Sequence, residues 1–253
     1  MGAGADGRVA NVIVLPDSVA LARRGAELFA AAAKESVVQA GRFTVALSGG
    51  RTPAALYEVF ASDPGLRAEV PWPRCYFFFG DERHVAPDHL ESNYRMAQES
   101  LLSRVPIDLS HVFRIKGELE NADRAAFEYE ESIRGFFQLS SGQFPRFDLV
   151  MLGLGSDGHV ASLFPGTRAL DERDRLVVAN RIDRLDTDRI TLTLPVLNEA
   201  ARVLVLVQGS EKAKTLAAVL HRAAGTQPLP AQLVQPTNGS LIWLVDKSAA
   251  ALL

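Results

Sequence analysis

A carboxylate and an imidazole stand two residues apart on a glycine-rich segment, GLGSDGH, at residues 153–159. Glycines make such a segment flexible enough to expose Asp157 and His159 beside each other. A histidine next to a carboxylate is the usual pair for activating a water molecule. The pattern indicates His159 as a candidate general base. The same pattern is also compatible with a structural role, in which His159 only makes hydrogen bonds within the protein.

The same segment matches two other motifs in part. The three glycines of residues 153–158 have the G-x-G-x-x-G spacing of dinucleotide-binding proteins. That motif requires a long helix after the third glycine, whereas Pro165 interrupts the chain soon afterwards. The nucleophile elbow of serine hydrolases has glycine two residues before the serine, and Leu154 stands there before Ser156. Neither a dinucleotide site nor a serine nucleophile is expected.

Two further segments could bind an anion. In SGGRTP, at residues 48–53, glycines let the backbone approach a ligand, Thr52 can cap the following helix and Pro53 suits its first turn. The segment GSEK repeats this design and places Lys212 in a first helical turn, where the helix dipole disfavours a cation. Both segments predict phosphate contacts, although an ordinary strand-to-helix turn and a solvated lysine fit them too. The candidate ligands in the first segment are Ser48, Gly49, Gly50, Arg51 and Thr52.

A fourth polar segment, GDERH at residues 80–84, brings two carboxylates, a guanidinium and an imidazole together directly after a very apolar run. Asp81 and Arg83 are therefore candidates for contacts with a ligand. Two purely structural alternatives remain: Asp81 can cap the next segment, and Arg83 can pair with Glu82 on the surface.

The elements that must position these segments can be predicted from the pattern of apolar residues. Short apolar runs are typical of buried parallel strands, and they cover residues 43–47, 75–79, 147–152 and 202–207, with 241–245 as a further candidate. Helical spacing covers residues 19–40, 54–61, 93–102, 123–137 and 211–220, the first with Asp17 or Ser18 as its cap and Gly41 as its end. Loops are expected over residues 1–9, 62–73, 138–146 and 223–231.

This alternation predicts an α/β fold with a layered, mostly parallel sheet flanked by helices. Ligands of such folds bind at the carboxyl ends of the strands, where loops converge and helix N-termini point inward. Because each polar segment follows a predicted strand, we expect them to form one site there.

The composition limits the kind of protein. A chain of 253 residues, 47% of them hydrophobic, can bury a large core, and we expect a single domain spanning residues 1–253. The net charge of -3 comes from scattered side chains, so no nucleic-acid partner is expected. The lone Cys75 excludes an intrachain disulfide and fits the reducing cytoplasm. No metal is expected, since His84 and His89 lack the spacing of a zinc pair. No signal peptide or membrane segment is apparent.

Six segments occur along the chain in one order: SGGRTP, GDERHV, SNYRMA (92–97), GLGSDGHVASLFPG, RITLTLP (189–195) and GSEKA. Together they make the chain resemble the 6-phosphogluconolactonase family from about Thr44 to about Leu220, and the segment ending DGHVASLFPG is the most specific. The resemblance implies one α/β domain related to glucosamine-6-phosphate deaminases and sugar-phosphate isomerases, without a cofactor. It also implies hydrolysis of 6-phospho-D-glucono-1,5-lactone to 6-phospho-D-gluconate in the oxidative pentose phosphate pathway.

The resemblance assigns catalytic roles to four residues. His159 would deprotonate the water that attacks the lactone carbonyl, and Asp157 would orient or tune it. Arg83 would contact the lactone or its phosphate. Asp81 would hold sugar hydroxyls or support the histidine. Such a reaction needs only a base and stabilisation of the oxyanion, because a six-membered lactone is an activated ester.

The resemblance assigns phosphate binding to the segment Ser48–Thr52 together with Lys212. Asn93 and Arg189 lie in matching segments, and their roles stay open. Arg51 departs from the small hydroxyl residue that the family often has after SGG, so it either contacts phosphate or faces solvent.

Two other functions are compatible with part of this pattern. In glucosamine-6-phosphate deaminases a similar histidine segment is followed by phenylalanine, asparagine and glutamate, whereas here the glutamate position is Phe164. The missing carboxylate disfavours ring opening and proton transfer between carbons. A sugar-phosphate-sensing regulator would need a DNA-binding module, but only one Ala-rich helix without a basic segment precedes residue 43. We expect a monomer or small homo-oligomer whose partner is a phosphorylated sugar lactone.

Overall fold

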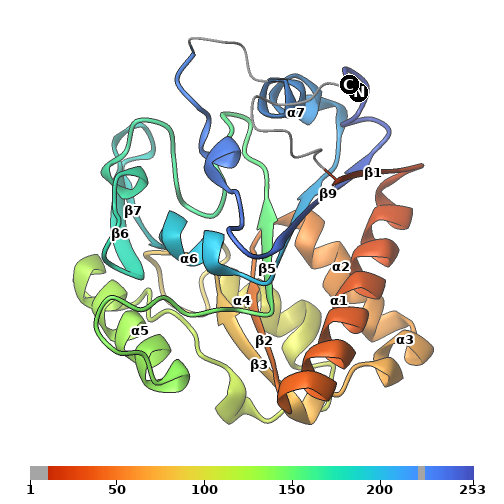
Figure 1. Cartoon of the computed structure of the whole chain (residues 1–253), viewed down its shortest axis with the longest axis horizontal. Helices are drawn as coiled ribbons and strands as arrows, with labels where there is room; N and C mark the ends of the chain where they lie inside the picture. Colours follow the sequence, from red (N-terminus) through yellow and green to blue (C-terminus); the bar gives the residue numbers. More distant parts are fainter. Residues whose placement is uncertain (1–10, 222–225) are drawn as a thin grey trace.

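The computed structural model describes residues 11–221 and 226–253. Its centre is a six-stranded parallel sheet with the strand order β1-β9-β8-β5-β2-β3 (Figure 1). The strands are β1 (Asn11–Leu15), β2 (Phe43–Leu47), β3 (Cys75–Phe79), β5 (Leu149–Gly153), β8 (Arg202–Val207) and β9 (Ser240–Asp246). Every predicted apolar run forms a strand, and the predicted α/β class is confirmed. The half-exposed strand β1 was not predicted.

Helices cover both faces of this sheet. They are α1 (Ser18–Ala40), α2 (Arg51–Ser62), α3 (Pro64–Glu69), α4 (Asn93–Ala97), α5 (Ala122–Phe137), α6 (Leu194–Glu199) and α7 (Ala213–Leu220). Figure 1 shows α1, α2 and α3 on one side of the sheet and α5 and α6 on the other. Helix α1 begins and ends as predicted, because Asp17 accepts a hydrogen bond from the backbone N–H of Ala20 and Gly41 adopts a left-handed conformation. None of the described helices is long and apolar enough to cross a membrane.

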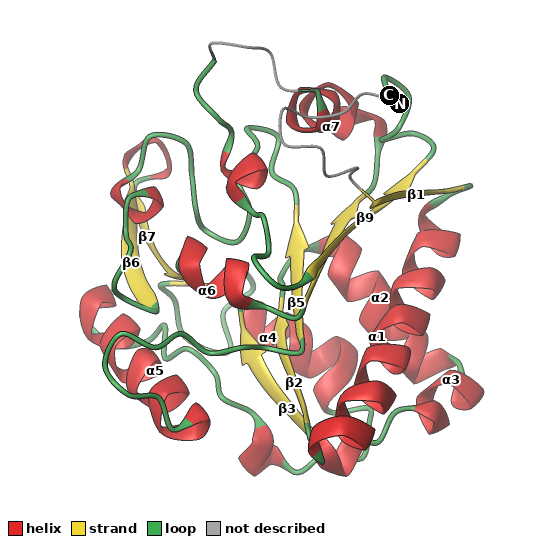
Figure 2. Cartoon of the chain, in the orientation of Figure 1, coloured by secondary structure: helices red, strands yellow, loops and turns green. Residues whose placement is uncertain are grey.

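A second, three-stranded sheet was not predicted. It is antiparallel and consists of β4 (Asp81–Arg83), β7 (Thr187–Leu192) and β6 (Val177–Ile182). Figure 2 shows β6 and β7 at the left, apart from the main sheet. Gly80 joins the two sheets, since its N–H donates to the carbonyl of Leu47 at 2.8 Å and its carbonyl accepts from Leu192 at 2.9 Å. The GDERH segment thus leaves one sheet and enters the other within a single residue.

The predicted loops had mixed outcomes. The loop expected over residues 62–73 is wrong, because Asp63 caps α3 by accepting from Leu66 and Pro64 occupies its first position. Residues 138–146 form a loop as expected. Residues 1–9 lie outside the described residues, as do the first three of the predicted loop 223–231, whose end begins a short 3₁₀ turn. The predicted helix over 93–102 is α4 followed by a π-helical turn.

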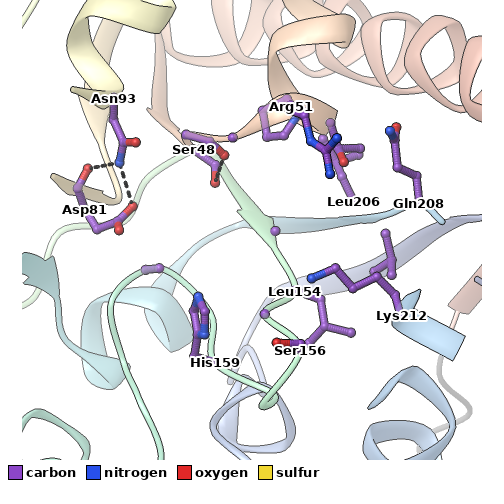
Figure 3. Close-up of a pocket in the computed structure, with 18 of the residues that line it drawn as sticks. Ser48, Arg51, Asp81, Asn93, Leu154, Ser156, His159, Leu206, Gln208 and Lys212 are labelled. Atoms are coloured by element: carbon purple, nitrogen blue, oxygen red, sulfur yellow. Dashed lines mark hydrogen bonds between the residues drawn. The ribbon is translucent and has the colours of Figure 1, made fainter. Parts of the chain in front are cut away.

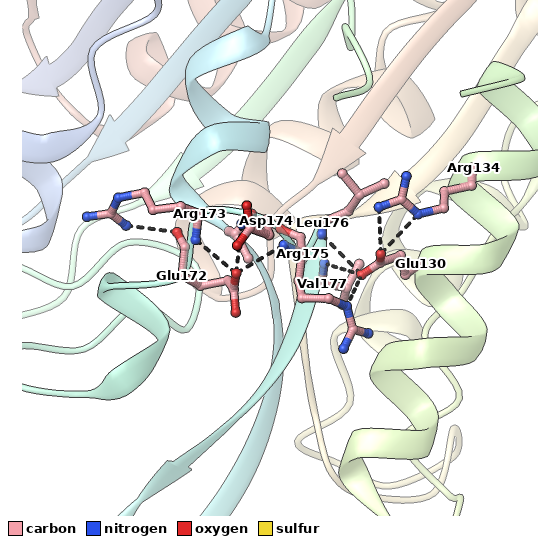
Figure 4. Close-up of polar contacts among 9 residues, drawn as sticks. Glu130, Arg134, Glu172, Arg173, Asp174, Arg175, Leu176 and Val177 are labelled. Atoms are coloured by element: carbon pink, nitrogen blue, oxygen red, sulfur yellow. Dashed lines mark hydrogen bonds and ion pairs between the residues drawn. The ribbon is translucent and has the colours of Figure 1, made fainter. Parts of the chain in front are cut away.

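A buried carboxylate fastens α5 to the second sheet. The Oε1 atom of Glu130 lies 2.8 Å from Nη2 of Arg134, and its Oε2 lies 2.8 Å from Nε of Arg175. The backbone N–H groups of Leu176 and Val177 also donate to Oε2 (Figure 4). These contacts fix the start of β6, so the sheet that contains the GDERH segment is held against a helix of the main layer.

Candidate active site

A cavity of about 330 Å³ lies at the carboxyl ends of β2, β5 and β8, beside the start of β4 (Figure 3). The polar segments that follow these strands converge on it, as expected. The predicted site residues that line it are Ser48, Gly49, Gly50, Arg51, Thr52, Asp81, Arg83, Asn93, His159 and Lys212. Asp157 and Arg189 were also predicted, and they do not line the cavity.

His159 and Asp157 form a close pair. Nδ1 of His159 lies 2.5 Å from Oδ1 of Asp157, which also accepts from the backbone N–H of His159 at 3.2 Å. Nε2 has no such partner among the described residues, and the side chain lines the cavity. The imidazole therefore has one nitrogen held by a carboxylate and the other free for a ligand or water, which is the arrangement of a general base.

Two more side chains contact this pair, and neither contact was predicted. The guanidinium of Arg184 forms an ion pair with Oδ2 of Asp157, and the ring of Phe164 packs on the imidazole with the centroids 4.1 Å apart. Burial alone would raise the pKa of Asp157. The neighbouring His159, its hydrogen bonds and Arg184 outweigh burial and hold the pKa of this carboxyl below its ordinary value. Asp157 is therefore ionised at neutral pH.

Asp81 is buried and has different partners from those that the sequence left open. Its Oδ2 accepts from the hydroxyl of Ser162 at 2.6 Å, and its Oδ1 accepts from the amide of Asn93 at 3.2 Å. Figure 3 shows Asn93 and Asp81 joined in this way at one end of the cavity. The carboxylate in contact with His159 is that of Asp157.

Glu82 is buried with 2% of its surface exposed, so the alternative of a surface pair with Arg83 is wrong. Its carboxylate accepts from the backbone N–H groups of Asn93 at 2.7 Å and Tyr94 at 2.8 Å, and from the hydroxyl of Ser92 at 3.0 Å. Burial raises the pKa of Glu82, and these hydrogen bonds oppose the rise. Glu82 thus holds the first turn of α4 and places Asn93 at the cavity.

The other end of the cavity is rich in groups that bind anions. Helix α2 begins at Arg51, with Gly50 as its N-cap and no capping side chain, so the predicted cap by Thr52 is wrong. The uncapped first turn leaves backbone N–H groups beside the cavity. In Figure 3, Arg51 and Lys212 point into the cavity from opposite sides. Glu211 lines it as well.

Two buried tyrosines hold the backbone where the main strands end. The hydroxyl of Tyr57 accepts from the N–H of Ser48 at 3.1 Å and donates to its carbonyl at 3.0 Å. Tyr129 does the same for Phe79, at 2.7 and 2.9 Å. Burial raises the pKa of both phenols, which keeps them protonated and able to donate. These hydroxyls fix the positions from which the site segments leave β2 and β3.

Arg83 and Arg189 are cross-strand neighbours in the second sheet. Arg83 lines the cavity, and its Nη1 donates to the carbonyl of Glu91 at 2.8 Å. Burial, followed by the charge of Arg83, lowers the pKa of Arg189. Arg189 adds positive charge beside Arg83 without lining the cavity.

No group of three or more His, Cys, Asp or Glu side chains within residues 11–221 and 226–253 is arranged to hold a metal ion. The side chains in contact with His159 are the carboxylate of Asp157 and the ring of Phe164. The site can therefore supply a base, hydrogen bonds and positive charge from its own side chains.

The fold is shared with proteins of known structure. A 6-phosphogluconolactonase from Trypanosoma cruzi superposes with a TM-score of 0.84 at 29% identity, covering 97% of both chains. One from Thermotoga maritima gives 0.80 at 32% identity, covering 94% of this chain and 100% of the other. A monomeric glucosamine-6-phosphate deaminase gives 0.79 at 19% identity, a likeness that concerns the fold alone.

Sequence relatives extend over most of the chain. A 6-phosphogluconolactonase from Nostoc sp. is 41% identical over 241 residues, which cover 95% of this chain and 97% of the relative. One from Synechocystis sp. is 41% identical over 215 residues, covering 85% and 86%. The family model described as glucosamine-6-phosphate isomerases/6-phosphogluconolactonase matches residues 16–243. The chain therefore belongs to the glucosamine-6-phosphate isomerase/6-phosphogluconolactonase family.

Proposed function

We propose that this chain is an enzyme that hydrolyses 6-phospho-D-glucono-1,5-lactone to 6-phospho-D-gluconate, a step of the oxidative pentose phosphate pathway. The observation that carries the proposal is the pair of Asp157 and His159 at a cavity whose far end holds Arg51 and Lys212. The relatives at 41% identity are 6-phosphogluconolactonases, which supports the same substrate here.

The reaction begins with a water molecule held by Nε2 of His159. Asp157 keeps the Nδ1–H toward itself, so Nε2 carries the lone pair and takes a proton from the water as it attacks the lactone carbonyl. The resulting oxyanion is stabilised by the guanidinium of Arg83, which lines the cavity. The tetrahedral intermediate then breaks its bond to the ring oxygen, which receives the proton from Nε2. The product is the open carboxylic acid.

The phosphate of the substrate binds at the other end. Arg51, Lys212 and the backbone N–H groups at the start of α2 supply the positive charge and hydrogen bonds. Their binding energy orients the lactone so that one face of its carbonyl meets the water held by His159. Asp81 accepts hydrogen bonds from the hydroxyls of the sugar. Arg189 acts through the charge that it adds beside Arg83.

Deaminase activity is disfavoured by Phe164. Its ring packs directly on the imidazole of His159, so an apolar group occupies the position where a deaminase has a carboxylate. The test is to give the purified protein fresh 6-phosphoglucono-δ-lactone and, separately, glucosamine 6-phosphate. We expect acid release well above the spontaneous rate from the lactone and no ammonia from the amino sugar. Ammonia release without lactone hydrolysis would overturn the proposal.

The sequence further supports a single domain spanning residues 1–253, located in the cytoplasm as a monomer or small homo-oligomer, without a nucleic-acid or membrane partner and without a cofactor. Light scattering during size-exclusion chromatography measures the oligomeric state. An assembly of more than four subunits would contradict this part of the proposal.

A further inference from the structure

The hairpin between β6 and β7 contacts the segment that carries Asp157 and His159 through one side chain. Arg184 lies in the 3₁₀ turn Asp183–Leu185 at the tip of this hairpin, and its Nη2 donates to Oδ2 of Asp157 across 27 residues of sequence. Its guanidinium also lies over the ring of Phe164, 5.2 Å from the centroid. One residue in the turn of the β6–β7 hairpin thus contacts both Asp157 and Phe164.

These two contacts converge on His159. Asp157 uses Oδ1 for Nδ1 of the imidazole and Oδ2 for Arg184, so the carboxylate is fixed at both oxygens. The ring of Phe164 packs on the imidazole and is also in contact with the guanidinium of Arg184. The two groups that restrain the imidazole are therefore both restrained by Arg184. A carboxylate held at both oxygens has less freedom to turn its hydrogen bond away from the imidazole.

We propose that Arg184 is a positioning residue for the general base: it holds Asp157 and Phe164, and through them it fixes the orientation of His159 and the ease with which the imidazole gains a proton. This inference rests on the proposed function for its catalytic consequence. It assigns a role to the β6–β7 hairpin, which contributes no residue to the lining of the cavity.

The sign of the electrostatic effect follows from the charges around the pair. Removing the cation of Arg184 favours the protonated imidazole, since a positive charge near it disappears and the negative charge of Asp157 is left without its second partner. Among the described residues, Asp157 has ion pairs only with His159 and Arg184. The other charged side chains that line the cavity with His159 are Arg51, Asp81, Arg83, Glu211 and Lys212. All of these stay in place in the variants below.

The same hairpin offers a matched control. Arg181 lies on β6, and its guanidinium pairs with Asp186 and, at 3.7 Å, with Asp188. Its side chain is 48% exposed, close to the 56% of Arg184, but its partners all belong to the hairpin. Arg181→Met therefore removes a similar guanidinium from the same hairpin without touching Asp157.

The test compares Arg184→Met, Arg184→Lys and Arg181→Met. We expect Arg184→Met to lower kcat by roughly 3- to 10-fold and to change KM by less than about twofold, because it disturbs the base and leaves the phosphate end intact. The acid limb of its pH–rate profile should move to higher pH by roughly half a unit, a modest shift because the guanidinium is partly solvated. Arg184→Lys should return the limb toward the wild-type position, and Arg181→Met should match wild type throughout.

A second measurement needs no substrate. The titration of the His159 imidazole can be followed by NMR in the free protein, with His159→Asn used to assign its signals. Arg184→Met should shift this titration to higher pH, and Arg181→Met should not. Identical titrations and pH–rate profiles in the two variants would overturn the inference. A wild-type protein without lactonase activity would instead overturn the proposed function, and the NMR titration would still decide whether Arg184 controls the imidazole.

Discussion

Gly155 and Gly49 lie where any side chain would collide with a residue of the site. A Cβ atom on Gly155 would be 2.0 Å from Nδ1 of His159, and one on Gly49 would be 1.8 Å from Oδ1 of Asn93. Both distances are far below van der Waals contact. The imidazole and the Asn93 amide therefore occupy space that only glycine leaves free, so glycine is required at these two positions by the site.

His159→Asn removes the proposed base and keeps a polar side chain of similar reach. Turnover should fall by roughly 10²- to 10⁴-fold, the usual contribution of a positioned general base. The acid limb of the pH–rate profile should disappear, because no imidazole remains to be protonated. Affinity for 6-phosphogluconate, measured by calorimetry, should change little. His221→Asn, at an exposed histidine outside the cavity, is the control. Near-normal turnover in His159→Asn would show that this histidine is structural.

Lys212→Ala tests the phosphate end. The ammonium should contribute a charge-assisted contact to phosphate alone, so KM for the phosphorylated lactone should rise by roughly 10- to 100-fold. Hydrolysis of unphosphorylated glucono-1,5-lactone should change much less. Lys214→Ala removes an exposed lysine from the first turn of α7, two residues further on, and should leave both rates unchanged. Equal losses on the two substrates would place Lys212 outside the phosphate site.

At the scale of secondary-structure elements, the site depends on contacts that hold the second sheet in place. Asp81 and Arg83 belong to β4, whose only strand partner in the described part of the chain is β7, and β7 pairs in turn with β6. The start of β6 is held by Glu130 of α5. A carboxylate remote from the cavity thus supports the elements that carry two of its charged residues.

Glu130→Gln should lower the free energy of unfolding by about 2–3 kcal/mol at neutral pH, because a buried carboxylate loses its charge while Arg134 and Arg175 keep theirs. Burial alone would raise the pKa of Glu130, but hydrogen bonds from Arg175, Arg134 and the backbone of Val177, together with the charge of Arg175, hold it below its ordinary value. A lowered carboxyl pKa stabilises the folded state above the ordinary pKa, and this contribution is lost as pH falls through the folded-state pKa. Urea unfolding should therefore show a large difference at pH 7 that shrinks below about pH 4.

The control for this variant lies on the same helix. Glu128→Gln disrupts pairs with Lys116 and Arg124 at the surface and should lower the stability much less than Glu130→Gln does. A Glu130→Gln variant as stable as Glu128→Gln, or with a difference independent of pH, would show that the buried cluster contributes no charge-dependent stability.

At the scale of the whole molecule, the proposed chemistry uses only side chains and backbone groups gathered at one end of the main sheet. Activity should therefore survive exhaustive treatment with EDTA, because the described residues include no metal-binding cluster and His159 acts directly on water. The measurement is the rate of lactone hydrolysis before and after chelation and dialysis. Loss of activity that a divalent cation restores would contradict the mechanism.

The sequence by itself determined five of the six strands of the main sheet, its larger helices and the segments that form the cavity. Each predicted strand was a short apolar run, and a strand buried on both faces must be apolar, so local composition carried the information. The cavity followed from the same reasoning, because parallel strands bring their carboxyl ends, and the polar segments after them, to one edge.

Only the tertiary structure decided the second sheet and the contacts that hold the site. The three residues of β4 and the polar strand β7 carry no apolar run that would mark them as strands. They pair because Gly80, which is hydrogen-bonded to both sheets, places β4 beside β7. Arg184 meets Asp157, and Tyr129 meets Phe79, across 27 and 50 residues. Such pairs leave no local pattern, since their energies depend on distances between atoms that become neighbours only when the chain has folded.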